Sequence, residues 1–95
     1  MTEGQLSIRV RIHGRVQGVW YRGWASDEAQ ALGLPGWARN RSDDTVEAVF
    51  SGSADKVRTM VERCREGPPA ARVDHIDESS ETEAVAPGIR VLPTL

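Results

Sequence analysis

Residues 14–22 carry the side chains and the spacing best suited to chemistry in this 95-residue chain. Gly14 and Gly18 lie four positions apart, so the backbone between them can adopt positive φ and turn its amides inward. The helical pattern that follows supplies free N–H groups and the positive end of a helix dipole, and Arg22 supplies a bidentate charged donor. These features predict a cradle for an anion. An ordinary glycine-containing turn with a surface arginine is the alternative that spacing alone leaves open.

A strand and a helix are predicted to position this loop. Residues 6–13 alternate strictly between apolar and polar side chains, which is typical of a half-buried strand. The helix-like segment after the loop runs to about Leu32, with Gly33 and Pro35 as its stop signal. The residues at helical spacing on its buried stripe are Tyr21, Ala25, Ala29 and Leu32.

Two further strands and a second helix follow. Residues 36–41 and 45–51 predict an antiparallel hairpin with its tight connection at residues 42–44. Ser53 is the predicted N-cap of the second helix, which ends at Gly67. The expected inward-facing residues are Val46, Ala48 and Phe50 on the strand, and Val57, Met60, Val61 and Cys64 on the helix.

Residues 71–76 predict a fourth strand, residues 77–83 a polar acidic loop, and residues 89–92 a short final extended piece. The order strand, helix, strand, strand, helix, strand predicts an α+β fold of the ferredoxin-like βαββαβ type. We expect a two-layer sandwich in which both helices pack on one face of an antiparallel sheet. Residues 1–95 are expected to form a single domain, because two domains of half this length would each bury too small a core.

Composition narrows the classes of function. Hydrophobic residues make up 39% of the chain and charged residues 27%, as in ordinary globular proteins. No segment approaches the ~18 apolar residues that a membrane span needs, and the first residues lack an export signal, so we expect a cytoplasmic protein without a membrane partner. The single cysteine, Cys64, excludes an internal disulfide and a thiolate-bound zinc site.

The charge pattern leaves one rival class open. Four arginines on predicted strand faces suggest a noncatalytic anion-binding or RNA-binding module: Arg9, Arg11, Arg39 and Arg41. Against this, the formal net charge is -2, and the strands lack the aromatic pairs that stack bases in the common RNA-binding version of this fold. We therefore expect no nucleic-acid partner.

A resemblance to a known family decides between these interpretations of the loop and of the strand arginines. Residues 14–22, GRVQGVWYR, resemble the acylphosphatase signature GxVQGVx[FY]R and match it at every specified position. Residues 36–40, GWARN, resemble the GWxxN motif of that family, and Val46 and Glu47 match the VE that follows it. The resemblance covers roughly residues 5–76. It implies a βαββαβ sandwich that hydrolyses the carboxyl-phosphate bond of acyl phosphates without a metal ion or an organic cofactor.

The resemblance also implies roles for individual residues. The loop amides and the Arg22 guanidinium would hold the phosphate, and the Asn40 side chain would orient the attacking water. Since asparagine is a poor base, we expect the proton to pass to a phosphate oxygen of the substrate. The expected partners are a small-molecule acyl phosphate and inorganic phosphate, and the expected state is a monomer. The implied phosphate-binding residues are Arg15, Val16, Gln17, Gly18, Val19, Trp20, Tyr21 and Arg22.

Two departures from the family pattern concern structure more than chemistry. Asp44 stands where the family usually has glycine in the second hairpin, which predicts a strained turn or a turn of another type. Residues 88–95 lack the aromatic residues expected in the last strand of the family, so the pairing of that strand stays open.

Other residues with chemical potential receive structural interpretations. His13 is expected to be a solvent-facing polar residue and not a general base, and His75 has no ligand cluster at metal-binding spacing in the sequence. Trp37 is expected to pack in the core, whereas Trp20 within the loop is left open as a wall of an acyl pocket.

Overall fold

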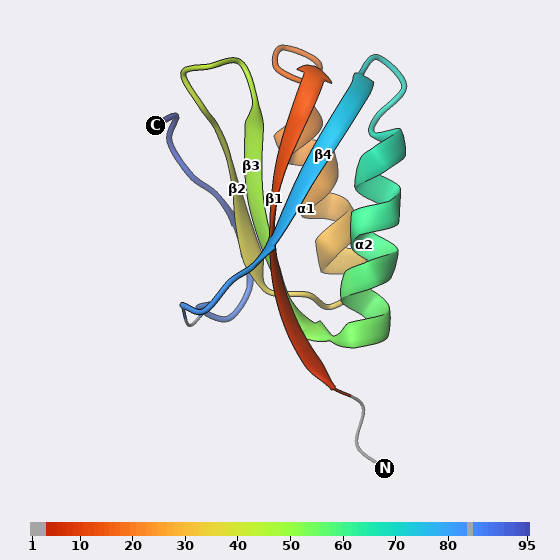
Figure 1. Cartoon of the computed structure of the whole chain (residues 1–95), viewed down its shortest axis with the longest axis vertical. Coiled ribbons are helices and arrows are strands. Elements are labelled where there is room, and N and C mark those ends of the chain that lie inside the picture. The colour runs from red at the N-terminus through yellow and green to blue at the C-terminus, as the bar shows by residue number, and fades with distance from the viewer. Residues whose placement is uncertain (1–3, 84) are drawn as a thin grey trace.

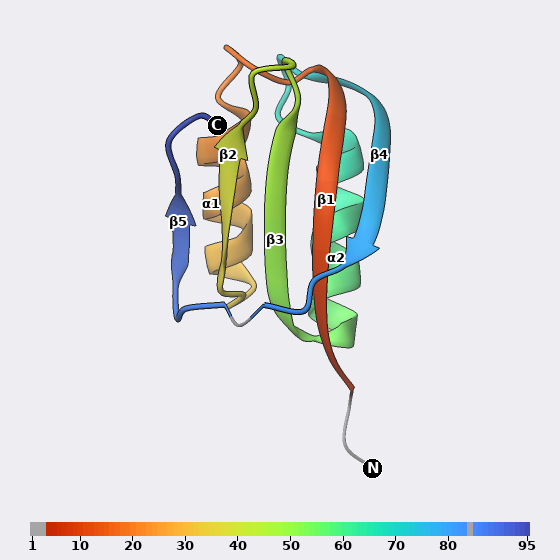
Figure 2. The ribbon, with the colours of Figure 1, turned by 60° about the vertical axis from the view of Figure 1, so that its left-hand side comes forward.

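Five strands form one sheet in the order β4-β1-β3-β2-β5, and two helices cover one of its faces (Figures 1 and 2). The computed structural model describes residues 4–83 and 85–95. In chain order the elements are β1 (Gln5–Arg15), α1 (Tyr21–Ala31), β2 (Gly36–Asn40), β3 (Val46–Ser53), α2 (Ala54–Glu66), β4 (Arg72–Ser80) and β5 (Ile89–Val91). The predicted βαββαβ sandwich is confirmed. Within the described ranges no helix is long and apolar enough to cross a membrane.

The sheet is mixed, which corrects the expectation of a fully antiparallel one. β1 pairs antiparallel with β3 and β4, and β2 pairs antiparallel with β3, but β5 lies parallel to β2. The chain leaves β4 and crosses to the far edge of the sheet at the end where β4 finishes (Figure 2). β5 must therefore run in the direction opposite to β4. β2 runs in that same direction, so β5 lies parallel to β2.

The core lies between the sheet and the two helices. The predicted inward residues Val46, Ala48 and Phe50 have no exposed surface, and the predicted helical stripe of α2 is buried as well. Burying one such aliphatic or aromatic side chain stabilises a fold by about 1.5–3 kcal/mol. Tyr21, Ala25 and Ala29 of α1 complete the core and place the start of α1 close to the sheet.

β4 extends through residues that the sequence analysis placed in an acidic loop. That prediction was wrong for residues 77–80, which pair with β1 as far as Ile8. β4 is an edge strand, so its polar side chains reach solvent while its backbone still forms hydrogen bonds with β1. The apolar pattern in the sequence therefore ends earlier along the strand than the pairing with β1 does. The other element ends differ from the expected ones by at most two residues.

Trp37 does not pack in the core, contrary to the expectation. Its neighbour Ala38 faces the helices, so Trp37 points to the opposite, helix-free face of the sheet. There its ring lies under two guanidinium groups, with the Arg39 Cζ 4.8 Å and the Arg9 Cζ 5.6 Å from the ring centroid. Trp24, in contrast, packs against the core beside Tyr21.

The turn between β2 and β3 carries the strain predicted at Asp44. Asp44 has a φ of 74°, a left-handed conformation that glycine adopts without cost. The Asp44 amide donates to the Arg41 carbonyl at 3.1 Å, and the Asp43 carboxylate accepts from the Thr45 amide at 3.1 Å and the Thr45 hydroxyl at 2.6 Å. These hydrogen bonds hold the pKa of the Asp43 carboxyl below its usual value.

We expect Asp44→Gly to raise the free energy of unfolding by about 0.5–1 kcal/mol, because relief of the left-handed strain exceeds the entropy that glycine gains in the unfolded chain. Asp43→Ala is the contrasting variant. It removes the acceptor of both Thr45 hydrogen bonds and is expected to lower the stability. Urea denaturation followed by tryptophan fluorescence measures both, and a less stable Asp44→Gly protein would contradict the strain argument.

Candidate active site

A cavity of about 270 Å³ brings the predicted site residues together at one end of the sandwich. Its walls come from the loop after β1, the first turn of α1, the end of β2 and the last strand. Arg22 and Asn40, which are 18 positions apart in the sequence, both line it. The lining residues are Val16, Gly18, Trp20, Tyr21, Arg22, Gly23, Asn40 and Val91.

The loop depends on glycine at two positions. Gly14 has a φ of 131°, and a Cβ there would overlap the Arg72 carbonyl oxygen on β4, so no larger residue fits. Gly18 has a φ of 73° with open space around it, so conformation and not crowding requires glycine. Trp20 is also left-handed, with a φ of 67°, and this residue is the N-cap of α1. The backbone therefore turns sharply as it enters the helix.

The amides of this loop are free to bind a ligand. Among the hydrogen bonds between described residues, none is donated by a backbone amide of residues 16–20. The first intrahelical bond of α1 runs from the Trp24 amide to the Trp20 carbonyl at 3.0 Å. Trp20 makes no side-chain cap, and the first turn of α1 carries no acidic residue. The positive end of this helix therefore faces the cavity without a side chain that neutralises it.

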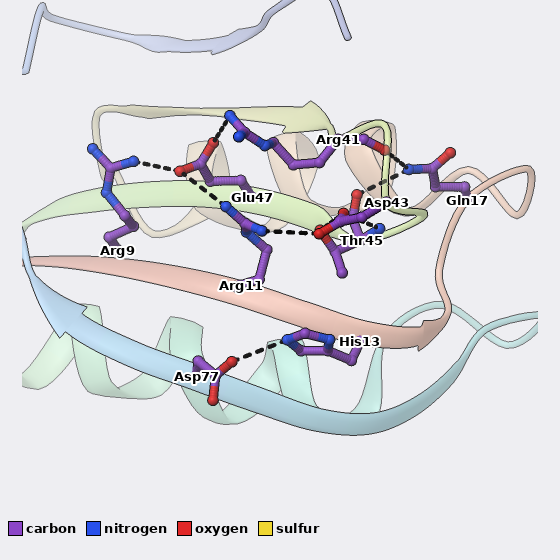
Figure 3. Close-up of polar contacts among 9 residues, drawn as sticks. All are labelled: Arg9, Arg11, His13, Gln17, Arg41, Asp43, Thr45, Glu47 and Asp77. Carbon is purple, nitrogen blue, oxygen red and sulfur yellow. Dashed lines mark hydrogen bonds and ion pairs between the residues drawn. The ribbon is translucent and has the colours of Figure 1, made fainter. Parts of the chain in front are cut away.

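Arg22 differs from most of the other arginines. Within residues 4–83 and 85–95, no side-chain hydrogen bond or ion pair involves Arg22, whereas Arg9, Arg11 and Arg41 are all bound to carboxylates. Figure 3 shows these three guanidinium groups gathered around Glu47, with Arg11 also bound to Asp43. The guanidinium of Arg22 is therefore available to a ligand in the cavity.

Gln17 has a role that the sequence analysis missed. Its side-chain amide donates to the Arg41 carbonyl at 2.8 Å and to the Thr45 carbonyl at 2.9 Å (Figure 3). These bonds brace the middle of the loop against the turn that follows Asn40. The family motif includes this glutamine, but only the approach of the two segments in space identifies the partners of its side chain.

We expect Gln17→Ala to loosen the loop, lower the free energy of unfolding by about 1–2 kcal/mol and weaken phosphate binding several-fold, because the two hydrogen bonds from this side chain to the Arg41 and Thr45 carbonyls are lost. Gln30→Ala is a matched control, since Gln30 is exposed on α1. Phosphate titration and thermal unfolding measure the two effects. Unchanged phosphate affinity in Gln17→Ala would refute the bracing role.

Asn40 is held from both sides through its backbone. It pairs with Val46 of β3, and its carbonyl accepts from the Leu95 amide at 3.1 Å. The Leu95 carbonyl in turn accepts from the Ser42 amide at 2.9 Å. The chain after β5 thus follows β2 to its end, which answers the open question of how the last strand pairs and places Val91 in the cavity wall.

The other predicted phosphate-binding residues contribute in different ways. The side chain of Arg15 is exposed and does not line the cavity, and Val19 packs against the core. Tyr21 is buried and donates to the Cys64 carbonyl at 2.6 Å, and burial raises the pKa of its hydroxyl. Burial likewise raises the pKa of Cys64 to about 12, so neither group is suited to act as a nucleophile.

Trp20 is 64% exposed and forms the outer wall of the cavity. Its indole lies against Gly23, where a Cβ would overlap the ring nitrogen.

A larger cavity of about 500 Å³ lies between the C-terminal end of α1 and the chain before β5. None of the described residues that line that cavity carries a charged side chain, so they offer no comparable site for an anion.

The fold and the cavity together define an α+β sandwich in which unbonded amides and Arg22 lie at a cavity beside the start of the first helix. A family model described as Acylphosphatase matches residues 8–87. Curated acylphosphatases from Rhizorhabdus wittichii and Rhodospirillum rubrum are 48% and 49% identical over 91 and 89 residues, covering 96% and 94% of this chain and 92% and 98% of theirs. This chain belongs to the acylphosphatase family and is a hydrolase of acyl phosphates.

Solved structures agree with this assignment. An acylphosphatase from Coxiella burnetii superimposes with a TM-score of 0.88 at 33% identity and covers 93% of each chain. The acylphosphatase from Bacillus subtilis gives a TM-score of 0.84 at 32% identity, covering 92% of this chain and 98% of the other. The ferredoxin-like fold predicted from the element order is therefore shared with acylphosphatases of known structure.

Proposed function

We propose that this acylphosphatase binds the phosphoryl group of its substrate with the amides of residues 15–22 and the Arg22 guanidinium, and that Asn40 orients the attacking water. The observation that carries the proposal is the convergence of Arg22, Asn40 and the unbonded loop amides on one cavity. Amide donors and a guanidinium match the oxygens of a phosphoryl group in both geometry and charge.

The reaction needs little beyond this arrangement. Water attacks the phosphorus, the bond between phosphorus and the acyl oxygen breaks, and the electron pair leaves with the carboxylate. The proton of the water passes to a phosphate oxygen, which yields a carboxylate and inorganic phosphate. Because the carboxylate is a good leaving group, positioning and charge stabilisation supply most of the lowering of the barrier. The Asn40 amide can both donate to and accept from the water.

Within residues 4–83 and 85–95, those that line the cavity offer no carboxylate, imidazole or thiol side chain. This donor set supports our proposal that the reaction requires neither a metal ion nor an organic cofactor. We also propose that residues 1–95 form one domain that works as a monomer in the cytoplasm, with a small-molecule acyl phosphate and inorganic phosphate as its partners.

An RNA-binding function receives less support. Of the four arginines that suggested this function, Arg39 stacks on Trp37. The other three are bound by carboxylates: Arg9 by Glu47 and Glu81, Arg11 by Asp43 and Glu47, and Arg41 by Glu47. A polyanion would have to displace these carboxylates. We therefore propose that the chain has no nucleic-acid partner.

The direct test is hydrolysis of benzoyl phosphate by the purified protein in the presence of EDTA. We expect turnover that EDTA leaves unchanged, with inorganic phosphate as a competitive inhibitor. Absence of turnover, or loss of turnover on adding EDTA, would contradict the proposed mechanism. Arg58→Ala, which alters an exposed arginine on α2, serves as the control for a general effect of removing positive charge.

A further inference from the structure

A second cluster of chemically capable side chains lies on the helix-free face of the sheet, away from the proposed catalytic cavity. His13 of β1 stands directly opposite His75 of β4 in the antiparallel register. Asp77 lies two residues beyond His75 on the same strand, so its side chain points to the same face. No metal-ligand spacing surrounds His75 in the sequence, because His13 is 62 positions away from it.

The three side chains converge on one point. The Nε2 of His13 lies 3.0 Å from Oδ2 of Asp77, and the Nε2 of His75 lies 2.6 Å from Oδ1 of the same carboxylate. The centroids of the two imidazole rings are 5.2 Å apart, and one potential ligand atom from each residue lies within 4.8 Å of the others. Figure 3 shows His13 reaching across to Asp77 between the two strands.

We propose that His13, His75 and Asp77 form a binding site for a divalent transition-metal ion, with Zn²⁺ as the ion that suits the ligands best. Two imidazole nitrogens and one carboxylate oxygen are a common three-ligand set for Zn²⁺, with water in the remaining position. Bonds of about 2.0–2.2 Å to a shared ion bring the ligand atoms to within about 3.5 Å of one another. A small rotation of these side chains is enough to reach that arrangement.

The surroundings permit such a rotation and the entry of an ion. The side chains of His13, His75 and Asp77 are 38%, 60% and 60% exposed. The two oxygens of the Asp77 carboxylate face the two imidazoles, so the carboxylate lies where an ion shared by all three side chains would bind.

Two of the neighbouring arginines are already bound to other carboxylates. Arg11 lies opposite Asp77 in the register, but its guanidinium binds Asp43 at 3.2 Å and approaches Glu47. Arg72 binds Asp74 at 2.9 Å. Because Arg11 and Arg72 bind these other carboxylates, they do not compete with an ion for the carboxylate of Asp77.

The chain holds few other imidazole or thiol groups that could compete for the ion. His13 and His75 are the only two histidines, and the single cysteine, Cys64, is fully buried on α2. None of the three proposed ligands lines the cavity with Arg22 and Asn40. The metal site would therefore tie the edge strand β4 to β1 without taking part in hydrolysis.

Titration of the folded protein with ZnCl₂, followed by NMR of the imidazole signals and by calorimetry, tests this site. We expect one ion per chain, a shift of both histidine signals together, and a rise in Tm of several degrees at saturation, because the ion binds only the folded state. His75→Ala and Asp77→Asn should each weaken Zn²⁺ binding at least about tenfold, in keeping with the loss of a ligand. Both variants should hydrolyse benzoyl phosphate normally in EDTA, which separates this proposal from the catalytic one.

Asp74→Asn is the matched control, since Asp74 is an exposed carboxylate on the same strand that binds Arg72 instead of the histidines. It should bind Zn²⁺ as the unaltered protein does. Three results would overturn the site: histidine signals that do not respond to Zn²⁺, unchanged affinity in His75→Ala and Asp77→Asn, or an equal loss of affinity in Asp74→Asn. Each would show that the cluster is only a set of surface hydrogen bonds.

Discussion

Arg22→Ala is expected to lose phosphate affinity and catalytic activity together, with kcat/KM on benzoyl phosphate falling by about 10²–10³-fold or more. Arg22 lines the cavity and its guanidinium has no carboxylate partner among the described residues, so we expect its charge to act on the phosphoryl group in both the ground state and the transition state. Removing the guanidinium also leaves the phosphoryl group, which is doubly charged, with the loop amides alone as its proposed hydrogen-bond donors. The inhibition constant of inorganic phosphate should rise in the same variant.

Arg22→Lys should perform nearly as badly. Lysine keeps the charge but presents it as a point, and it loses the planar fork that donates two parallel hydrogen bonds to phosphate. Arg58→Ala should keep both the activity and the phosphate inhibition, because Arg58 is exposed on α2. An Arg22→Lys enzyme with normal kcat/KM would show that charge alone matters and that bidentate geometry does not.

Asn40→Ala is expected to separate binding from turnover. We expect the inhibition constant of phosphate to stay within about twofold while kcat falls by about 10²–10³-fold, the pattern of a group needed mainly in the transition state. The backbone at residue 40 is held by Val46 and Leu95, so truncating the side chain should leave the strand in place. Near-normal kcat in this variant would refute the water-orienting role.

A structural control accompanies this prediction. Thermal unfolding should show that Asn40→Ala stays folded, since the hydrogen bonds that hold β2 to β3 and to the chain after β5 are made by the backbone. A large drop in Tm together with weaker phosphate binding would instead indicate that Asn40 acts mainly by holding the end of β2 in position.

The sequence by itself determined the elements and their buried faces. The period-two pattern of residues 6–13 and the helical stripe of Val57, Met60, Val61 and Cys64 both proved correct, because burial of one face depends on local spacing that the chain displays directly. The loop motif and the GWxxN motif indicated Arg22 and Asn40, which the fold brings to one cavity. Sequence reasoning succeeded where the controlling interaction is local, and the roles of Arg22 and Asn40 stay predictions.

Only the tertiary structure decided which distant segments meet. It placed β5 parallel to β2 with Val91 in the cavity wall, turned Trp37 to the helix-free face, joined Gln17 to the turn after Asn40, and assembled His13 with His75 and Asp77. In each case the deciding contact joins strands or loops that are far apart along the chain. Such contacts depend on sheet order and register, which a local pattern of apolar and polar residues does not specify.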